Sequence, residues 1–219
     1  MKNMKSIKSQ QSGFTLVEIA IVLVIIGLLL GGILKGQELI NSAKAKSFAQ
    51  DFRTIQTALY GFQDRYKALP GDFAGTRLTN SITGATTATG TTINNGQIDG
   101  AWDSVSGTDE SCLFWQHLRL AGFLAGPTVV DCAGGSEYLQ KNADSGRIGI
   151  STTMQIGTMT GSFNICSSGI QGKLAKQLDT QLDDGTTNTG SLRVALITAP
   201  TAALATVADA DATIVCLAF

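Results

Sequence analysis

The longest apolar run of the chain extends from Phe14 to Leu34, and Glu18 is the only charged residue in it. At about 1.5 Å per residue, a helix of this length covers the roughly 30 Å of a bilayer core. An ionised carboxylate at such depth costs on the order of 2.5–3.5 kcal/mol on insertion scales, and it indicates a functional residue with a partner. No obvious partner for Glu18 lies within its own helix. We therefore expect residues 14–34 to form a transmembrane half-helix, with Glu18 as a candidate functional residue.

The helical pattern continues beyond this run without a break. Apolar residues recur at spacings of three and four and form a single stripe, which consists of Phe48, Phe52, Ile55, Leu59, Phe62 and Tyr66. Such a stripe is typical of a helix that lays one face on the rest of the protein and exposes the other. Pro70-Gly71 then ends the helix. Residues 35–69 are thus predicted to be the amphipathic outer half of one long N-terminal helix.

Residues 70–219 show short, mixed patterns that predict one globular domain. The Thr- and Gly-rich segment from Gly75 to Gly96 has no periodicity and indicates a long exposed connection. Short helices are expected at Trp115–Leu124 and Gly172–Leu182. The predicted strands are Arg147–Ile150, Met154–Ile156, Ser162–Cys166, Leu192–Thr198 and Thr213–Phe219. Strands that follow one long helix favour an α+β fold, in which the helix packs on an antiparallel β-sheet.

Glycines interrupt the apolar run in two G-x-x-x-G spacings, Gly27/Gly31 and Gly32/Gly36. This spacing lets helix backbones approach each other closely in lipid, so these four residues are candidate helix-packing positions. Each glycine also lowers helix propensity by roughly 1 kcal/mol relative to alanine, so the stretch can instead mark a place where the helix bends or melts. Glycines tolerated in a membrane helix without a special role remain a third interpretation.

The charge distribution predicts the topology. Lys2, Lys5 and Lys8 lie in the leader, residues 1–13, which contains no acidic residue. By the positive-inside rule, the N-terminus is cytoplasmic and everything after Leu34 is exported. The apolar run is not followed by the A-x-A pattern of an ordinary secretory cleavage site, whereas a small-residue junction, Gly13-Phe14, precedes it. The formal net charge of −1 does not indicate a nucleic-acid partner.

The four cysteines, Cys112, Cys132, Cys166 and Cys216, all fall in the part predicted to be exported, and none forms a C-x-x-C pair. Two disulfides in an oxidising compartment are therefore expected, rather than free thiols or a zinc site. Of the three possible pairings we favour Cys112–Cys132, because these residues are near in sequence. The same pairing joins Cys166 to Cys216 and ties the C-terminal strand to an inner one.

Catalytic and metal-binding patterns are not visible. With 219 residues, few aromatics and an outer part rich in small residues, the chain favours one light, loop-rich unit over a large enzyme core. His117 is the only histidine, and neither G-x-S-x-G, H-E-x-x-H nor a phosphate-binding glycine loop occurs. Oxygen ligands for calcium are available at Asp179, Asp183 and Asp184, but Asp-Asp-Gly is mainly a turn signal. We therefore predict no enzyme, no cofactor and no metal site.

The segment Gly13-Phe14-Thr15-Leu16-Val17-Glu18, between a short basic leader and an apolar run, resembles the class III signal of type IV pilins and type II secretion pseudopilins. The resemblance implies that a membrane-embedded prepilin peptidase cuts after Gly13 and methylates the new amino terminus, Phe14. It makes Glu18 the glutamate at the fifth mature position. Further motifs resemble a pattern found in one group of pilin-like proteins: Ala68–Phe73, Asn95–Ile98, Glu110-Ser111, Trp115–Gly122, Leu178-Asp179 and Leu182–Gly185.

The resemblance implies a structural subunit of a type IV pilus or similar filament, made as a single-pass inner-membrane protein and then present in a periplasmic or cell-surface filament. Its implied partners are other pilins, the prepilin peptidase, the inner-membrane assembly platform and, before assembly, membrane lipid. Alternatives are a pseudopilin of type II secretion or a minor tip pilin acting as an adhesin or DNA-uptake module. A membrane-anchored periplasmic enzyme is a further class.

The resemblance also leads to a specific hypothesis for the role of Glu18. Cleavage creates a cationic amine on Phe14, and in a filament the amine of one subunit can meet the Glu18 carboxylate of its neighbour. In a medium of low dielectric constant, this attraction favours correct docking over two unpaired charges. The competing interpretation is that Glu18 reaches the membrane interface or is protonated, since it lies only a few residues inside the span.

Overall fold

A computed structural model describes residues 15–90, 92–134, 136–153 and 156–219 of the chain. Gly13, Phe14 and Met154 therefore lie outside the described residues. The chain divides into two units, of which the first ends at Asn41 and the second begins at Ser42. Helix α1, Leu16–Tyr66, has 51 residues and contributes to both units. This confirms the long N-terminal helix predicted from the two consecutive apolar patterns.

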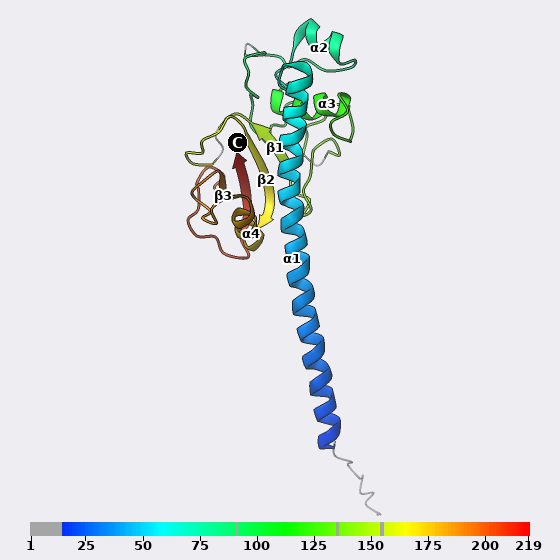
Figure 1. The fold of residues 1–219 in the computed structure, drawn as a ribbon, viewed down its shortest axis with the longest axis vertical. Coiled ribbons are helices and arrows are strands. Elements are labelled where there is room, and N and C mark those ends of the chain that lie inside the picture. The colour runs from blue at the N-terminus through cyan, green and yellow to red at the C-terminus, as the bar shows by residue number, and fades with distance from the viewer. Residues whose placement is uncertain (1–14, 91, 135, 154–155) are drawn as a thin grey trace, which may run out of the picture. The chain divides into compact units, whose positions relative to one another are not determined.

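The outer unit, residues 42–219, contains an antiparallel sheet of four strands in the order β1-β2-β4-β3 (Figure 1). The strands are β1 Ile148–Ser151, β2 Asn164–Gln171, β3 Leu192–Leu196 and β4 Ala212–Ala218. Helix α4, Gly172–Leu182, connects β2 to β3 and has the predicted bounds. The predicted α+β fold, a long helix packed on an antiparallel sheet, is therefore confirmed.

One face of this sheet packs against the outer part of α1. Phe48, Phe52, Ile55, Leu59 and Phe62 of the predicted stripe are all at least 97% buried. They share one core with alternate residues of the strands and with the apolar face of α4. The helix ends at Tyr66, four residues before Pro70, as the sequence indicates. Burial of large aromatic side chains along successive turns thus holds the outer part of α1 on the sheet.

The opposite face of the sheet is also covered, which the sequence did not reveal. Because side chains alternate across a strand, Cys166 and Cys216 lie on the face opposite to Ile165 and Val215. A second buried cluster covers that face, and its members from the loops are Trp102, Ile156 and Met159. The long irregular segments of the outer unit therefore supply a core layer of their own.

Three expectations for the irregular segments are wrong. The segment Gly75–Gly96 is not simply an exposed connection: it contains helix α2, Gly75–Ser81, and buries Leu78, Ile82 and Ala88. Leu78 and Ile82 have the helical spacing of four, but the Thr- and Gly-rich residues around them do not continue it, so the segment shows no extended pattern. In the predicted strand Met154–Ile156, the described residue is Ile156, and it belongs to no strand. Strand β2 runs to Gln171 instead of Cys166, past a bulge between Ser168 and Ile170.

The predicted helix Trp115–Leu124 is displaced. Helix α3 spans Glu110–Leu120, so it begins five residues earlier and ends before Phe123. Gly122 has φ +80° and lies at the position after the C-cap, where its N–H donates to the Arg119 carbonyl while the Phe123 N–H donates to that of Leu118. These two bonds form a Schellman motif, which ends the helix although apolar residues follow.

Candidate functional site

The start of α1 forms a capping box around Glu18. The Thr15 N–H and the Thr15 hydroxyl both donate to Oε2 of Glu18, each at 2.8 Å. In return, the Glu18 N–H donates to Oγ1 of Thr15 at 3.2 Å. This reciprocal T-x-x-E arrangement satisfies N–H groups that the first helical turn leaves without partners, and it places a carboxylate at the positive end of the helix dipole.

Glu18 therefore has a partner inside its own helix, and the expectation that it has none was wrong. The missed signal was the spacing Thr15-x-x-Glu18, which is a known helix-start pattern. Both bonds end on Oε2, so Oε1 of Glu18 can still accept a donor from another molecule.

The residues of α1 that follow Glu18 are apolar and exposed in the single chain. The large apolar side chains between Leu16 and Leu34 are 46–91% exposed. Among the described helices, α1 is the one long and apolar enough to cross a membrane. A surface of this kind needs lipid or other apolar helices around it.

The glycines of this segment fall on two sides of the helix. Gly36 follows Glu18 by eighteen positions, or five full turns at 3.6 residues per turn. It therefore lies on the same face of α1 as Glu18, five turns nearer the C-terminal end. Gly32 is about 40° away from that line, while Gly27 and Gly31 are about 140–180° away. An added Cβ at any of the four would meet no other atom within 4 Å in the single chain. One glycine pair is thus aligned with the carboxylate and the other is not.

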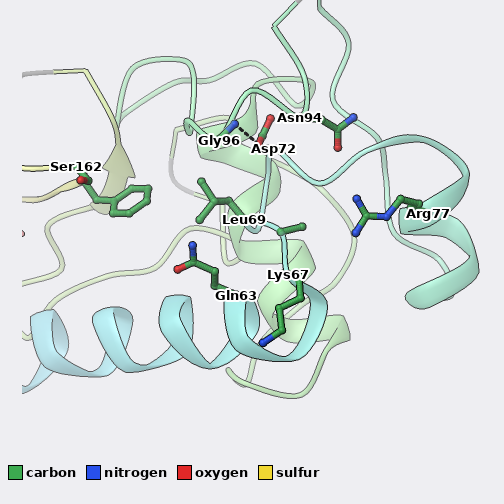
Figure 2. Close-up of a pocket in the computed structure, with 10 residues that line it drawn as sticks. Gln63, Lys67, Leu69, Asp72, Arg77, Asn94, Gly96 and Ser162 are labelled. Atoms are coloured by element: carbon green, nitrogen blue, oxygen red, sulfur yellow. Dashed lines mark hydrogen bonds between the residues drawn. The ribbon is translucent and has the colours of Figure 1, made fainter.

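In the outer unit, motifs far apart in the sequence meet in a buried polar cluster, which we define as the buried residues Asp72, Glu110 and His117 together with the half-buried Asp99. The Asp72 carboxylate accepts the N–H groups of Asn95, at 3.0 Å, and Gly96, at 2.9 Å (Figure 2). It thereby fixes the loop after α2 to the turn after α1.

Glu110 joins the same cluster from the first turn of α3. Its side chain is 3% exposed, and its Oε2 accepts the Asp99 N–H at 2.8 Å, while Oε1 has no hydrogen-bond donor among the described residues. Burial raises the pKa of Glu110 to about 7, and the neighbouring Asp72 and Asp99 carboxylates add to the shift. The turn after α1 approaches the backbone of α3 closely at Gly71. This residue has φ +92°, and a Cβ there would collide with the Glu110 carbonyl oxygen.

His117 is fully buried and structural in its contacts. Its Nδ1 accepts the Gly71 N–H at 2.9 Å, which fixes the tautomer, so Nε2 carries the proton and donates to the Thr86 carbonyl at 2.9 Å. Burial lowers the pKa of His117 to about 4. With both ring nitrogens engaged, the imidazole has no free position for acid–base chemistry.

The other polar residues of α3 also serve as ties between loops. Gln116 accepts the Thr86 N–H and donates to the Thr128 carbonyl. Arg119 donates to the carbonyls of Pro127 and Tyr138. The outer motif around Trp115–Gly122 is thus explained by buried hydrogen bonds that hold the long loops, because buried polar groups are stable only when paired.

The disulfides complete this framework. The structure joins Cys112 to Cys132 and Cys166 to Cys216. Cys166 and Cys216 face each other directly in the β2–β4 register, so their bond links the two central strands. Cys112 lies in α3, and its bond attaches the loop around Cys132 to that helix.

A cavity of about 410 Å³ adjoins the buried polar cluster. Figure 2 shows Gln63 of α1 and Lys67, which directly follows that helix, on one side, with Arg77 of α2, Asn94 and Ser162 around the cavity. Asp72 also lines it, but both of its carboxylate oxygens already accept backbone N–H groups. The described lining residues therefore contain no nucleophile paired with a base.

Comparison with known protein families identifies the N-terminal segment: the prokaryotic N-terminal methylation motif matches residues 8–34. The chain carries a class III signal peptide of type IV pilin-like proteins. The match includes Gly13, Phe14 and Glu18, although the first two lie outside the described residues. No curated protein and no solved structure matches the chain.

This motif supports a type IV pilin-like or pseudopilin precursor. Proteins with the motif are structural pilin-like subunits, and the motif implies processing by a prepilin peptidase and assembly with other pilins. The exposed apolar part of α1 fits membrane anchoring. The matched residues lie in the first unit or before it.

Proposed function

We propose that the chain is a structural subunit of a type IV pilus or pilus-like filament, which its N-terminal helix assembles. The observation that carries the proposal is the methylation motif over residues 8–34, placed at the start of an apolar helix whose side chains are exposed. Before assembly, lipid covers this helix; afterwards, the helices of neighbouring subunits do. The N-terminus is cytoplasmic and the outer unit is exported.

Processing prepares the docking group. A prepilin peptidase cuts between Gly13 and Phe14 and methylates the Phe14 amine, which stays cationic. Oε2 of Glu18 is held by Thr15, which orients the carboxylate and leaves Oε1 for the Phe14 amine of a neighbouring subunit. Two charges that are costly in lipid become a pair only when two subunits dock in register.

Close helix packing is the second part of the proposal. Gly32 and Gly36 lie on the Glu18 side of α1, so a neighbouring backbone can approach along the face that carries the charge pair. This placement favours a packing role for that pair over glycines that are merely tolerated.

The first test is the intact mass of the protein after co-expression with a prepilin peptidase. We expect a mature chain that begins at Phe14 and carries one methyl group. An inactive peptidase is the control and should leave the chain uncut. An uncut chain with the active enzyme, or a cut beyond Leu34, would contradict the proposal.

A further inference from the structure

A cavity beside the C-terminal end of α1 carries two cationic side chains. It is the cavity of about 410 Å³ next to the buried polar cluster, and its volume lies within the range of small-molecule binding sites. Lys67, which follows α1, and Arg77 of α2 line it from different segments of the chain (Figure 2). The third charged residue of the lining is Asp72, so two cations face one carboxylate.

Asp72 does not occupy the donors of Arg77. Both of its carboxylate oxygens accept backbone N–H groups, as described above. Arg77 forms neither a hydrogen bond nor an ion pair with any described residue, and its guanidinium lies over the Phe73 ring, 5.3 Å from the ring centroid. This stacking uses the face of the guanidinium and leaves its N–H groups for another molecule.

Lys67 occupies a backbone position that usually belongs to glycine. It has φ +51°, in the left-handed region, and its N–H donates to the Gln63 carbonyl at 2.8 Å where α1 ends. Its ammonium pairs with Asp64 at 2.8 Å, but both side chains are at least 75% exposed, so the pair is weak and can exchange for a ligand. The fold thus keeps a cation where glycine would fit with less strain, which indicates a role for this side chain.

Neutral groups complete the lining of the cavity. Among the described residues, no partner hydrogen-bonds to the Gln63 amide or to the Ser162 hydroxyl. The side-chain NH₂ of Asn94 is also available, since only its Oδ1 is used, by a backbone N–H. Leu69 and Phe163 are buried and add an apolar part to the same cavity. The cavity therefore combines positive charge, neutral hydrogen-bonding groups and apolar surface.

We propose that this cavity binds an acidic sugar, a ring that carries one carboxylate and several hydroxyls. Arg77 binds the carboxylate, because a guanidinium can donate two parallel hydrogen bonds to it, and Lys67 adds a second positive charge. The amide and hydroxyl groups of the lining bind the sugar hydroxyls, and the apolar side chains contact the C–H groups of the ring. An inorganic anion would use the cations alone and leave most of the cavity to water. This inference does not depend on the proposed filament function.

Ligand-detected NMR titration of the full-length chain in detergent tests the proposal, with glucuronate, glucose and inorganic phosphate as probes. We expect glucuronate to bind with a dissociation constant on the order of 1 mM, and more weakly in about 0.5 M NaCl, which screens exposed charges. Glucose has the same ring without the carboxylate and should bind about tenfold more weakly or less, and phosphate should also bind more weakly. No binding of glucuronate, or binding of glucose or phosphate as tight as that of glucuronate, would overturn the proposal.

Arg77→Gln is the decisive variant, because it removes the charge and keeps a polar side chain. It should weaken glucuronate binding about tenfold or more and leave the unfolding midpoint nearly unchanged, since Arg77 is exposed. Lys67→Gly should weaken binding by a smaller factor without lowering the midpoint, because glycine adopts this backbone conformation more readily. Arg53→Gln is the matched control: Arg53 is an exposed arginine of α1 that lines a different cavity, and this variant should bind like the wild type. Equal glucuronate binding by Arg77→Gln and the wild type would also overturn the proposal.

Discussion

At the scale of single residues, the outer unit depends on ionisable groups buried in a fixed protonation state. Glu110 retains its proton to a pH near 7 in the folded chain, against an ordinary value of 4.5. His117 instead stays neutral down to a pH near 4, against an ordinary value of 6.5. Because the two pKa shifts have opposite directions, Glu110 lowers the stability of the fold as the pH rises, and His117 lowers it as the pH falls.

The stability contribution of Glu110 should therefore be present below about pH 4.5 and lost as the pH rises towards 7, because the unfolded chain then gives up a proton that the folded chain retains. Glu110→Gln removes this loss. We expect the variant to exceed the wild type by several degrees in unfolding midpoint at pH 8, at about 2–4 °C per kcal/mol for a domain of this size, and by much less at pH 4.5.

Thermal unfolding measured from pH 4 to pH 8 checks this. Glu137→Gln is the control, because Glu137 is exposed in the same unit, and its curve should run parallel to that of the wild type. A Glu110→Gln curve that is also parallel to the wild type would show that Glu110 is not a buried neutral acid.

At the scale of elements, sequence patterns predicted those parts that have their own periodicity. The apolar stripe of α1 and the bounds of α4 followed from spacing alone. Helix α2 and the early start of α3 did not, because tertiary contacts decide them: Leu78 is a single buried anchor, and the polar first turn of α3 is buried through hydrogen bonds to distant loops. The spacing of residues within a short segment cannot show contacts with segments far away in the sequence.

The glycine pairs of α1 allow a test at this scale. Leucines at Gly32 and Gly36 should severely reduce incorporation into filaments, because they fill the side of the helix that carries Glu18. Leucines at Gly27 and Gly31 make the same change in volume on the other side and are the matched control, with a smaller expected effect. Both double variants should still insert into the membrane.

Immunoblots of purified filaments and of total membranes measure incorporation for each variant. Equal incorporation of both double variants would mean that neither pair is specific to the docking face. If both double variants also assembled at the wild-type level, the glycines would be residues that the apolar helix merely tolerates.

At the scale of the whole molecule, the two units have different kinds of surface. The part of α1 before Asn41 exposes apolar side chains, which are unfavourable in water without lipid or neighbouring helices around them. The outer unit instead has a sheet covered on both faces and two disulfides. The sequence predicted the apolar surface of the first unit from the apolar run, but it did not predict that the units divide between Asn41 and Ser42, beyond the predicted end of the transmembrane half at Leu34. It did not predict the second core layer, since Trp102, Ile156 and Met159 are isolated apolar residues in loops.

The central claim is that Glu18 docks each subunit by pairing with the Phe14 amine of its neighbour. The most direct measurement is the amount of Glu18→Ala protein in purified filaments from a strain without another copy of the chain. We expect insertion and cleavage to remain largely intact while incorporation is abolished or severely reduced, with Glu18→Asp less affected. Glu38→Ala, which removes an exposed carboxylate that pairs with Lys35, is the control and should assemble normally. Glu18→Ala at the wild-type level in filaments would contradict the charge-pair account.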